Sequence, residues 1–300
     1  MLVFGFGPYF GGMMALFILA MDHRDSLAKK VYKITGDPSP AEIKHIAEGK
    51  ELVFQGLLSS ERLDQAGVLV DERYGEQVAR QAKRAGLTLA MPIERSGQPW
   101  FGLEYGNLGE GVWMEHVEAF DPRYVKILVR DNPDFDLRDR RRQMDDLATV
   151  SQVLSDSGRD LLLELLVPAT PAQDSPTYDD DLRPDLTVRI IGEMQAAGVE
   201  PAIWKIEGLN APSDAAHILA TARQGGRNGV QCIVLGRDAP QADLDRWLRV
   251  AAPEGFLGFA IGRSIWQDPL EDFLAEELTE SEVVAQVAAN YRHYADTWAS

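Results

Sequence analysis

The sequence predicts an α/β protein that folds as a single (β/α)8 TIM barrel. Short apolar runs occur eight times along the chain, and amphipathic, helix-like segments separate them. The length of 300 residues is one that a single barrel domain commonly uses. Strict alternation of strand and helix favours a closed parallel sheet, and an open, doubly wound sheet is the alternative that this pattern leaves.

The apolar runs are too short for globular helices, and several are rich in Val, Ile and Leu. Near-continuous apolar runs of this kind are typical of parallel strands that are buried on both faces. We therefore expect strands over residues 15–21, 67–71, 87–93, 124–130, 161–167, 203–207, 230–235 and 256–261.

Helix signals fill many of the intervals between these runs. Helices are expected over residues 76–85, 139–157, 185–197, 213–223, 242–251 and 281–298. Glycines stand where helix C-caps are expected, at Gly86, Gly158, Gly198 and Gly225. Proline is favoured in the first turn of a helix, so we also expect helix starts at Pro212 and at Asp268-Pro269.

The two longest connections, residues 96–115 and 168–184, each follow the carboxyl end of an expected strand. Active sites of barrels lie at that end. Long loops in compact domains are either lids over a site or solvated excursions, and the sequence leaves both interpretations open.

Charge and cysteine content limit the classes of partner and compartment. The chain has 47 acidic and 30 basic residues, which gives a formal net charge of −17. A strongly acidic surface repels phosphate backbones, so we expect no nucleic-acid partner. Cys232 is the single cysteine, which excludes an intrachain disulfide and fits a reducing, cytoplasmic setting.

Residues 1–20 are almost entirely apolar, yet no Lys or Arg precedes Met21 and several glycines interrupt the run. A signal peptide normally begins with basic residues, and a membrane span needs a longer continuous apolar segment. We therefore expect no membrane role, an N-terminal extension over residues 1–14, and one barrel domain over residues 15–300.

Charged residues stand at or near the carboxyl ends of most of the expected strands. Charges within apolar runs are costly unless they are paired or used, and a ring of them at one end of a barrel indicates a site. The ring contains Asp22, His23, Arg24, Asp71, Glu72, Glu94, Arg95, Lys126, Arg130, Glu164, Lys205, Glu207, Arg237, Asp238 and Arg263.

Two lysines, Lys126 and Lys205, stand within these strands. Side-chain alternation puts Lys126 on the face of Arg130, and Lys205 on the face of Glu207. If both faces point inward, burial and a neighbouring cation lower the pKa of a lysine, and the neutral amine can form an imine with a ketone. The alternative is a structural ion pair, for example between Lys205 and Glu164.

Glu164 lies between leucines, so we expect burial to raise its pKa and to make it a proton carrier near neutrality. Alternatively, Glu164 only neutralises the positive charge of a lysine. The pairs Gly236-Arg237 and Gly262-Arg263 close the last two strands, where barrels usually bind phosphate. Glycine lets backbone N–H groups approach a phosphate and arginine supplies a bidentate fork, although surface salt bridges would also explain these arginines.

The sequence gives no reason to expect a metal ion or a cofactor. No close group of His, Cys, Asp and Glu has metal-ligand spacing, and no glycine-rich nucleotide-binding motif is present.

At these residues the chain resembles the aldolase-like domain that is fused behind the sugar kinase in long forms of bacterial 5-dehydro-2-deoxygluconokinase. The resemblance covers most of the chain, and no kinase half is present in the sequence. The segments that carry it are residues 22–24, 70–75, 89–94, 120–122, 125–133, 164–170, 204–208, 233–237 and 258–263.

That family is in turn similar to tagatose-1,6-bisphosphate aldolase and related class I aldolases. The resemblance implies that Lys205 is the Schiff-base lysine and that Lys126 and Glu164 match two further active-site residues. The tagatose enzymes have Asp-Gln-Arg where this chain has Asp22-His23-Arg24, which puts their bisphosphate substrate in doubt. The implied reaction cleaves 5-dehydro-2-deoxy-6-phosphogluconate to dihydroxyacetone phosphate and malonate semialdehyde.

These inferences give each residue an expected role. Lys205, Lys126, Glu164 and Asp22 form the catalytic group. In it Glu164, with help from Lys126, moves protons, including the hydroxyl proton whose removal starts carbon–carbon cleavage, and Asp22 orients hydroxyls. The substrate-binding group is Arg24, Arg130, Glu207, Gly236, Arg237, Gly262 and Arg263. Within it, Arg237 and Arg263 hold the phosphate, and Arg24 or Arg130 holds a substrate carboxylate.

The expected partner is a phosphorylated sugar, and a homo-oligomer is allowed. Two other functions stay open at this point. One is an aldolase for a different ketose phosphate or sulfosugar phosphate, and the other is a barrel that binds a sugar phosphate without catalysis.

Overall fold

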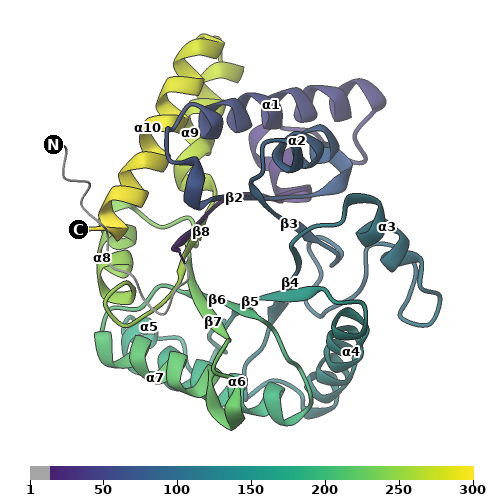
Figure 1. The fold of residues 1–300 in the computed structure, drawn as a ribbon, viewed down its shortest axis with the longest axis vertical. Coiled ribbons are helices and arrows are strands. Elements are labelled where there is room, and N and C mark those ends of the chain that lie inside the picture. Colours follow the sequence, from purple (N-terminus) through teal and green to yellow (C-terminus); the bar gives the residue numbers. More distant parts are fainter. Residues whose placement is uncertain (1–13) are drawn as a thin grey trace, which may run out of the picture.

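The computed structural model describes residues 14–300 and shows one ring of strands with helices around it (Figure 1). All neighbouring strands are parallel, and β8 pairs with β1, so the sheet is a closed barrel in sequence order. The strands are β1 (Leu16–Met21), β2 (Ala66–Val70), β3 (Thr88–Pro92), β4 (Tyr124–Arg130), β5 (Asp160–Leu166), β6 (Ile203–Glu207), β7 (Gln231–Leu235) and β8 (Gly258–Ile261). The predicted (β/α)8 barrel is confirmed, and the open sheet is excluded.

The helices lie outside the strands, and the six that the sequence predicts are all present. They are η1 (Leu27–Val31), α1 (Pro40–Leu58), η2 (Leu63–Gln65), α2 (Glu72–Arg84), α3 (Val112–Phe120), α4 (Leu137–Asp156), α5 (Tyr178–Asp181), α6 (Arg183–Ala196), α7 (Pro212–Ala222), η3 (Gln224–Gly226), α8 (Gln241–Ala251), α9 (Arg263–Leu274) and α10 (Glu280–Trp298). Helix α2 begins earlier than expected because Asp71, directly after β2, caps it and accepts a hydrogen bond from the Tyr74 amide at 2.9 Å.

The helix boundaries that depend on glycine agree with expectation at three of the four positions. Backbone φ is positive at all four, with values of 73° at Gly86, 71° at Gly158, 90° at Gly198 and 67° at Gly225. A side chain disfavours this left-handed conformation, so Gly86, Gly158 and Gly198 follow the C-caps of α2, α4 and α6 at little cost. Gly225 does not cap α7, whose C-cap is Arg223, but lies inside η3. Pro212 stands in the first turn of α7, as predicted.

The helix start expected at Asp268-Pro269 is wrong. Helix α9 already begins at Arg263, directly after β8, and Pro269 lies inside it. A proline within a helix leaves the carbonyl four residues earlier without its usual donor. Here the Asn290 side chain of α10 donates to the Ile265 carbonyl at 2.9 Å, so α9 continues through the proline.

The apolar core has two parts. The smaller part contains only residues of the strands and of the turns that lead into them, and it fills the inside of the barrel. The larger part joins the outer faces of the strands to the surrounding helices. Successive residues of β1 alternate between the two parts, as side chains of a strand must when both faces are buried.

Helix α10 covers the join between the first and the last strand. The Tyr291 hydroxyl donates to the Phe17 carbonyl of β1 at 2.8 Å. The rings of Phe17 and Phe259 stack across the join with centroids 4.8 Å apart. The last helix and the last strand therefore fix the position of the first strand.

The N-terminal extension that we predict for residues 1–14 lies outside the described residues, except for Met14. Within residues 14–300, no helix has the length and apolar character that crossing a membrane requires.

Candidate active site

A cavity of about 610 Å³ opens at the carboxyl ends of the barrel strands. Its walls include Lys126 from β4, Glu164 from β5 and Lys205 from β6, which the sequence predicts to share one cavity. The residues that follow β1, β3, β7 and β8 complete the walls. Most of the strand-end charges therefore surround a single space, at the end of the barrel where active sites of this fold lie. Asp71, Glu72 and the predicted substrate-binding residue Glu207 do not line it.

Lys126 lies at the centre of a group of three carboxylates. Its Nζ atom is 2.7 Å from Asp22 Oδ2, 2.8 Å from Glu94 Oε1 and 3.0 Å from Glu164 Oε2. Burial disfavours the charged amine, but the three carboxylates outweigh burial and raise the pKa of Lys126. The expectation of a lowered pKa is therefore wrong for this lysine, which stays protonated.

Lys205 has a simpler environment. It is buried, and its Nζ atom lies 2.7 Å from Glu164 Oε1. Glu164 and Lys205 face each other on neighbouring strands, since their Cα atoms are register partners of β5 and β6. The structure thus shows both the ion pair that the sequence offers as an alternative and access of Lys205 to the cavity.

The expected rise in the pKa of Glu164 is also wrong. Burial alone would raise it, but Lys126 and Lys205 together hold the pKa of this carboxyl below its usual range. Each oxygen of Glu164 lies within 3.0 Å of a lysine ammonium. The sequence places leucines beside Glu164 but does not show that two cations converge on it.

Glu94 is a buried carboxyl whose pKa is raised by burial, as is the pKa of Glu207 at the end of β6. Glu94 follows β3 and contacts Lys126 at 2.8 Å and Arg24 at 3.5 Å, both through Oε1. Burial raises the pKa of Glu94 more than Lys126 and Arg24 lower it. The sequence places Glu94 among the strand-end charges, but its role could not be assigned because the structure alone shows that it reaches Lys126.

Asp22 and His23 lie side by side at the end of β1 with opposite electrostatic outcomes. Burial raises the pKa of Asp22, but the nearby Lys126 and Lys205 outweigh burial, so the pKa is lowered and Asp22 is ionised. Burial and the nearby Arg263 lower the pKa of His23 to about 4, so the imidazole is neutral near pH 7. The buried His23 Nδ1 has no hydrogen-bond partner among the described residues.

Lys50 is a buried cation that the sequence reasoning missed; it does not line the cavity but supports the backbone at the end of β1. Its Nζ atom donates to the Met21 carbonyl at 2.6 Å and to the His23 carbonyl at 3.1 Å, and it also pairs with Asp71. Burial lowers the pKa of Lys50. It lies on α1 within the apolar face that carries Ile46 and Val53, which is the sequence signal that could have revealed it.

The two predicted phosphate-binding arginines lie at the rim of the cavity and pair with carboxylates. Arg237 Nη1 is 2.9 Å from Asp179 Oδ2, and Arg237 Nε is 3.2 Å from Glu207 Oε1. Arg263 Nη1 is 2.7 Å from Asp238 Oδ2. The salt bridges that the sequence offers as an alternative are therefore present, and a phosphate would have to share or replace these carboxylates.

Backbone geometry around these arginines is tight. Arg237 and Asp238 both have a positive φ, 50° and 57°, which non-glycine residues rarely adopt. A Cβ atom at Gly262 would lie 2.5 Å from the Ala20 carbonyl oxygen, so only glycine fits there. A Cβ atom at Gly236 would lie 3.3 Å from Ile261, which is crowded but less severe.

Parts of both long connections reach the site. Arg130 lines the cavity and its Nη1 donates to the Gln98 carbonyl at 3.2 Å, in the connection after β3. Trp100 and Phe101 of the same connection also line the cavity. The connection after β5 carries Asp179, the partner of Arg237. These contacts fit the lid interpretation better than plain solvated loops.

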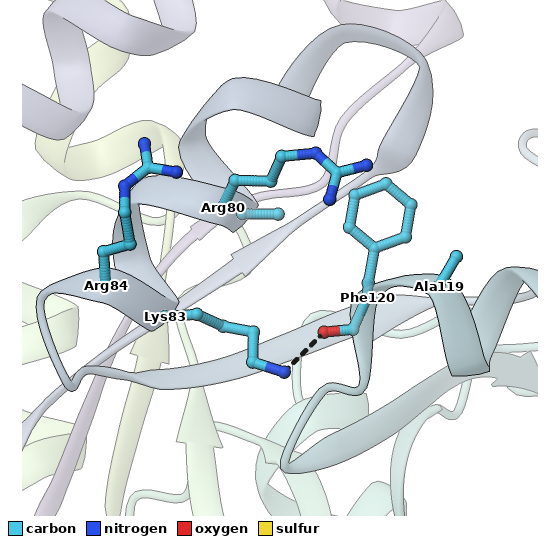
Figure 2. A pocket seen from close by; sticks show the side chains of 6 residues that line it. Arg80, Lys83, Arg84, Ala119 and Phe120 are labelled. Carbon is cyan, nitrogen blue, oxygen red and sulfur yellow. Dashed lines mark hydrogen bonds between the residues drawn. The ribbon is translucent and has the colours of Figure 1, made fainter.

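A second hollow, of about 220 Å³, lies between α2 and α3 (Figure 2). Its Lys83 donates to the Phe120 carbonyl at 2.9 Å, and Arg80 pairs with Glu76. These cations hold the end of α3 and the surface of α2, and the hollow contains no nucleophile beside a base. In residues 14–300, no group of three or more His, Cys, Asp and Glu side chains is arranged to hold a metal ion.

Solved structures of aldolases share this fold over most of both chains. Fructose-bisphosphate aldolase from Plasmodium falciparum has a TM-score of 0.67 at 14% identity, and the match covers 96% of this chain and 90% of that one. An archaeal fructose 1,6-bisphosphate aldolase has a TM-score of 0.58 at 13% identity, with 95% and 94% covered. Fructose-bisphosphate aldolase from Slackia heliotrinireducens has a TM-score of 0.51 at 14% identity, with 92% and 86% covered. At these identities the likeness shows the common barrel.

No curated protein sequence matches the chain. A family model described as "Uncharacterized protein conserved in bacteria (DUF2090)" matches residues 11–300. Because this match spans nearly the whole sequence, the chain belongs to that family.

Proposed function

We propose that this protein is a class I aldolase, a carbon-carbon lyase that forms a Schiff base with a phosphorylated keto sugar acid. The observation that carries the proposal is the contrast between two buried lysines in one cavity. Lys126 is held by three carboxylates, whereas among the described residues Lys205 pairs with Glu164 alone, and it faces the same space. Imine chemistry needs an amine that is free to attack a carbonyl carbon, and three ion pairs restrain Lys126 where one restrains Lys205.

The proposed mechanism starts with the amine of Lys205, which attacks the ketone carbon and forms an imine. Glu164 contacts this amine and moves the protons of imine formation and of the neighbouring carbon. The ammonium of Lys126 balances the charge of the carboxylates and polarises substrate hydroxyls. Asp22, ionised and bound to Lys126, orients those hydroxyls.

Substrate binding is proposed to use two groups of arginines that line the cavity. Arg237 and Arg263 bind the phosphate in exchange for part of their contact with Asp179 and Asp238, with Gly236 and Gly262 leaving room beside them. Glu207 keeps Arg237 in place. Arg130, at the end of β4, or Arg24, after β1, binds a substrate carboxylate within the same cavity.

A substrate with a phosphate at one end and a carboxylate at the other fits these two groups. The resemblance to the kinase-fused aldolase-like domain names one such compound, 5-dehydro-2-deoxy-6-phosphogluconate. We propose it as the substrate, with dihydroxyacetone phosphate and malonate semialdehyde as products in the cytoplasm. The aldolase folds described above are consistent with this class of reaction.

Borohydride reduction tests the imine directly, because it converts a transient Schiff base into a stable adduct that intact mass measurement detects. Wild-type protein should gain the mass of the reduced substrate adduct. Lys205→Met should lose both turnover and adduct, since the nucleophile is gone. Lys126→Met should slow turnover but still give adduct, since it removes a charge and not the attacking amine.

Two results would contradict the proposal. Adduct that persists in Lys205→Met and disappears in Lys126→Met would reverse the roles of the two lysines. Absence of adduct in every protein, together with cleavage that depends on added divalent metal, would refute the Schiff-base mechanism.

A further inference from the structure

The two cations that pair with the carboxyl of Glu94 both contact the same one of its oxygens. Lys126 and Arg24 both contact Oε1, at 2.8 Å and 3.5 Å. The second oxygen, Oε2, is buried and has no hydrogen-bond partner among the described residues. A buried carboxylate oxygen without a donor is costly, so this atom is suited to receive a donor from a ligand.

The surroundings of Glu94 place that atom beside the space where substrate would lie. Glu94 lines the same cavity as Lys205, and its side chain is only 9% exposed. Glu164 Oε2 also lacks a hydrogen-bond partner among the described residues, but it lies 3.0 Å from Lys126 Nζ, and Glu164 Oε1 lies 2.7 Å from Lys205 Nζ. Sugar hydroxyls are the donors that a substrate would bring into this cavity.

We propose that Glu94 is a catalytic base that takes the proton from the substrate hydroxyl next to the carbon–carbon bond that breaks. This rests on the proposed aldolase function and divides the proton transfers between two carboxylates. Glu164 serves the imine nitrogen and the carbon beside it, while Glu94 serves the hydroxyl at the far end of the breaking bond.

The electrostatic state of Glu94 agrees with such a role. The groups that face it are Lys126 from β4 and Asp22 and Arg24 after β1. Burial exceeds the effect of these charges and raises the pKa of Glu94, whereas the pKa of Glu164 is lowered. A carboxyl with a raised pKa is the stronger base of the two near neutrality.

The proposed cleavage step moves one proton and three electron pairs. Glu94 Oε2 accepts the hydroxyl proton, and the electron pair of that O–H bond forms the carbonyl of the aldehyde product. The adjacent carbon–carbon bond breaks, and its electron pair forms the carbon–carbon double bond of the enamine. The former imine π pair moves to the nitrogen of Lys205, and the protonated Glu94 returns its proton to water after the aldehyde leaves.

The test uses two reactions that share the Lys205 imine but differ in the need for a hydroxyl base. Cleavage of the full substrate requires both proton transfers. Exchange of the carbon-bound proton of dihydroxyacetone phosphate with deuterium oxide requires only imine and enamine formation. Glu94→Gln should therefore lose cleavage by about 100-fold or more, the range that general base catalysis supplies, and keep deuterium exchange and borohydride trapping.

Glu104→Gln is the matched control. Glu104 contacts the same Arg24 at 3.5 Å but does not line the cavity, so this variant should cleave and exchange like wild type. Glu94→Asp should recover part of the cleavage, because it restores a carboxylate that Gln cannot supply. Thermal unfolding of each variant shows whether the fold is kept.

Three outcomes would overturn the assignment of Glu94. Cleavage by Glu94→Gln at the wild-type rate would show that the reaction does not use Glu94 as a base. Equal loss of cleavage and exchange in Glu94→Gln indicates that Glu94 only organises Lys126 and Arg24. Failure of wild type itself to trap an imine refutes the aldolase proposal, and the inference about Glu94 falls with it.

Discussion

The two lysines of the site show how position within a barrel decides the state of a residue. Lys126 meets carboxylates from the ends of three other strands, whereas Lys205 meets one from its neighbour. Both lysines lie in similar apolar runs, so local sequence makes them look equivalent. The two lysines differ in their surroundings only in the closed barrel, where the positions of the strands determine which carboxylates contact each amine.

The arginines at the rim give a prediction about binding. Arg237→Ala or Arg263→Ala should weaken binding of phosphorylated ligands by about 1.5 to 3 kcal/mol, the usual value of a charge-assisted hydrogen bond. Calorimetric titration with a ketose phosphate and with the matching unphosphorylated ketose measures the difference. If both ligands weaken equally in either variant, that arginine does not bind the phosphate.

His23 gives a prediction about acid stability. Its pKa is lowered by burial from 6.5 to about 4, so the folded state binds fewer protons here than the unfolded state between these values. The stabilising effect is complete above the unfolded pKa and is lost as pH falls toward the folded pKa. Between about pH 7 and about pH 4.5, wild type should lose about 2 to 3 kcal/mol of unfolding free energy through this group.

Denaturant unfolding of wild type and His23→Gln at both pH values measures this contribution. Glutamine is a polar side chain without a charge in this range, so the variant should show a smaller drop in unfolding free energy. An identical pH dependence in both proteins would mean that the histidine is protonated without cost in the folded state.

At the scale of elements, the end of β7 joins three parts of the site. Arg237 there pairs with Asp179, which lies on the short helix α5, and with Glu207 at the end of β6. Its neighbour Asp238 pairs with Arg263 at the start of α9. Both positions have a left-handed backbone, a conformation that non-glycine residues adopt at a cost and that often occurs at functional sites.

Helix α10 offers a test of an element's own stability. Thr279 caps it and forms a reciprocal capping box with Glu282. Thr279→Ala should lower the unfolding free energy by about 1 kcal/mol, because the cap satisfies an otherwise free amide. Thr149→Ala, at an exposed position inside α4, is the control and should be neutral or slightly stabilising, because alanine favours helix interiors.

Denaturant titration at constant pH compares these two threonine variants. If Thr149→Ala lowers the unfolding free energy as much as Thr279→Ala does, the loss in Thr279→Ala does not come from the capping contacts.

Most element boundaries follow from local signals, and the exceptions have identifiable causes. Strand ends lie within two residues of expectation because apolar run length sets them directly. The start of α9 was misplaced because Pro269 normally marks a helix start, and its tolerance depends on Asn290, a residue of a different helix. No sequence pattern near Pro269 indicates that the Asn290 side chain donates to the Ile265 carbonyl.

For the whole molecule, the fold and the location of the site were predictable while the charge states within it were not. Eight alternations of run and helix specify a closed barrel, and its carboxyl end collects the strand-end charges. The pKa directions of Lys126 and Glu164 came out opposite to expectation because each depends on partners from distant segments. Lys50 was missed because it reaches the end of β1 from a helix.

The join under α10 bears on how the protein is made. Strand β1 is synthesised before its partner β8 and before the Tyr291 that bonds to Phe17. Until β8 has been made, one edge of β1 lacks the neighbour that it has in the barrel, and such edges invite pairing with other chains. Closure of the barrel therefore also removes an edge of β1 that is open to pairing with other chains while the protein is being made.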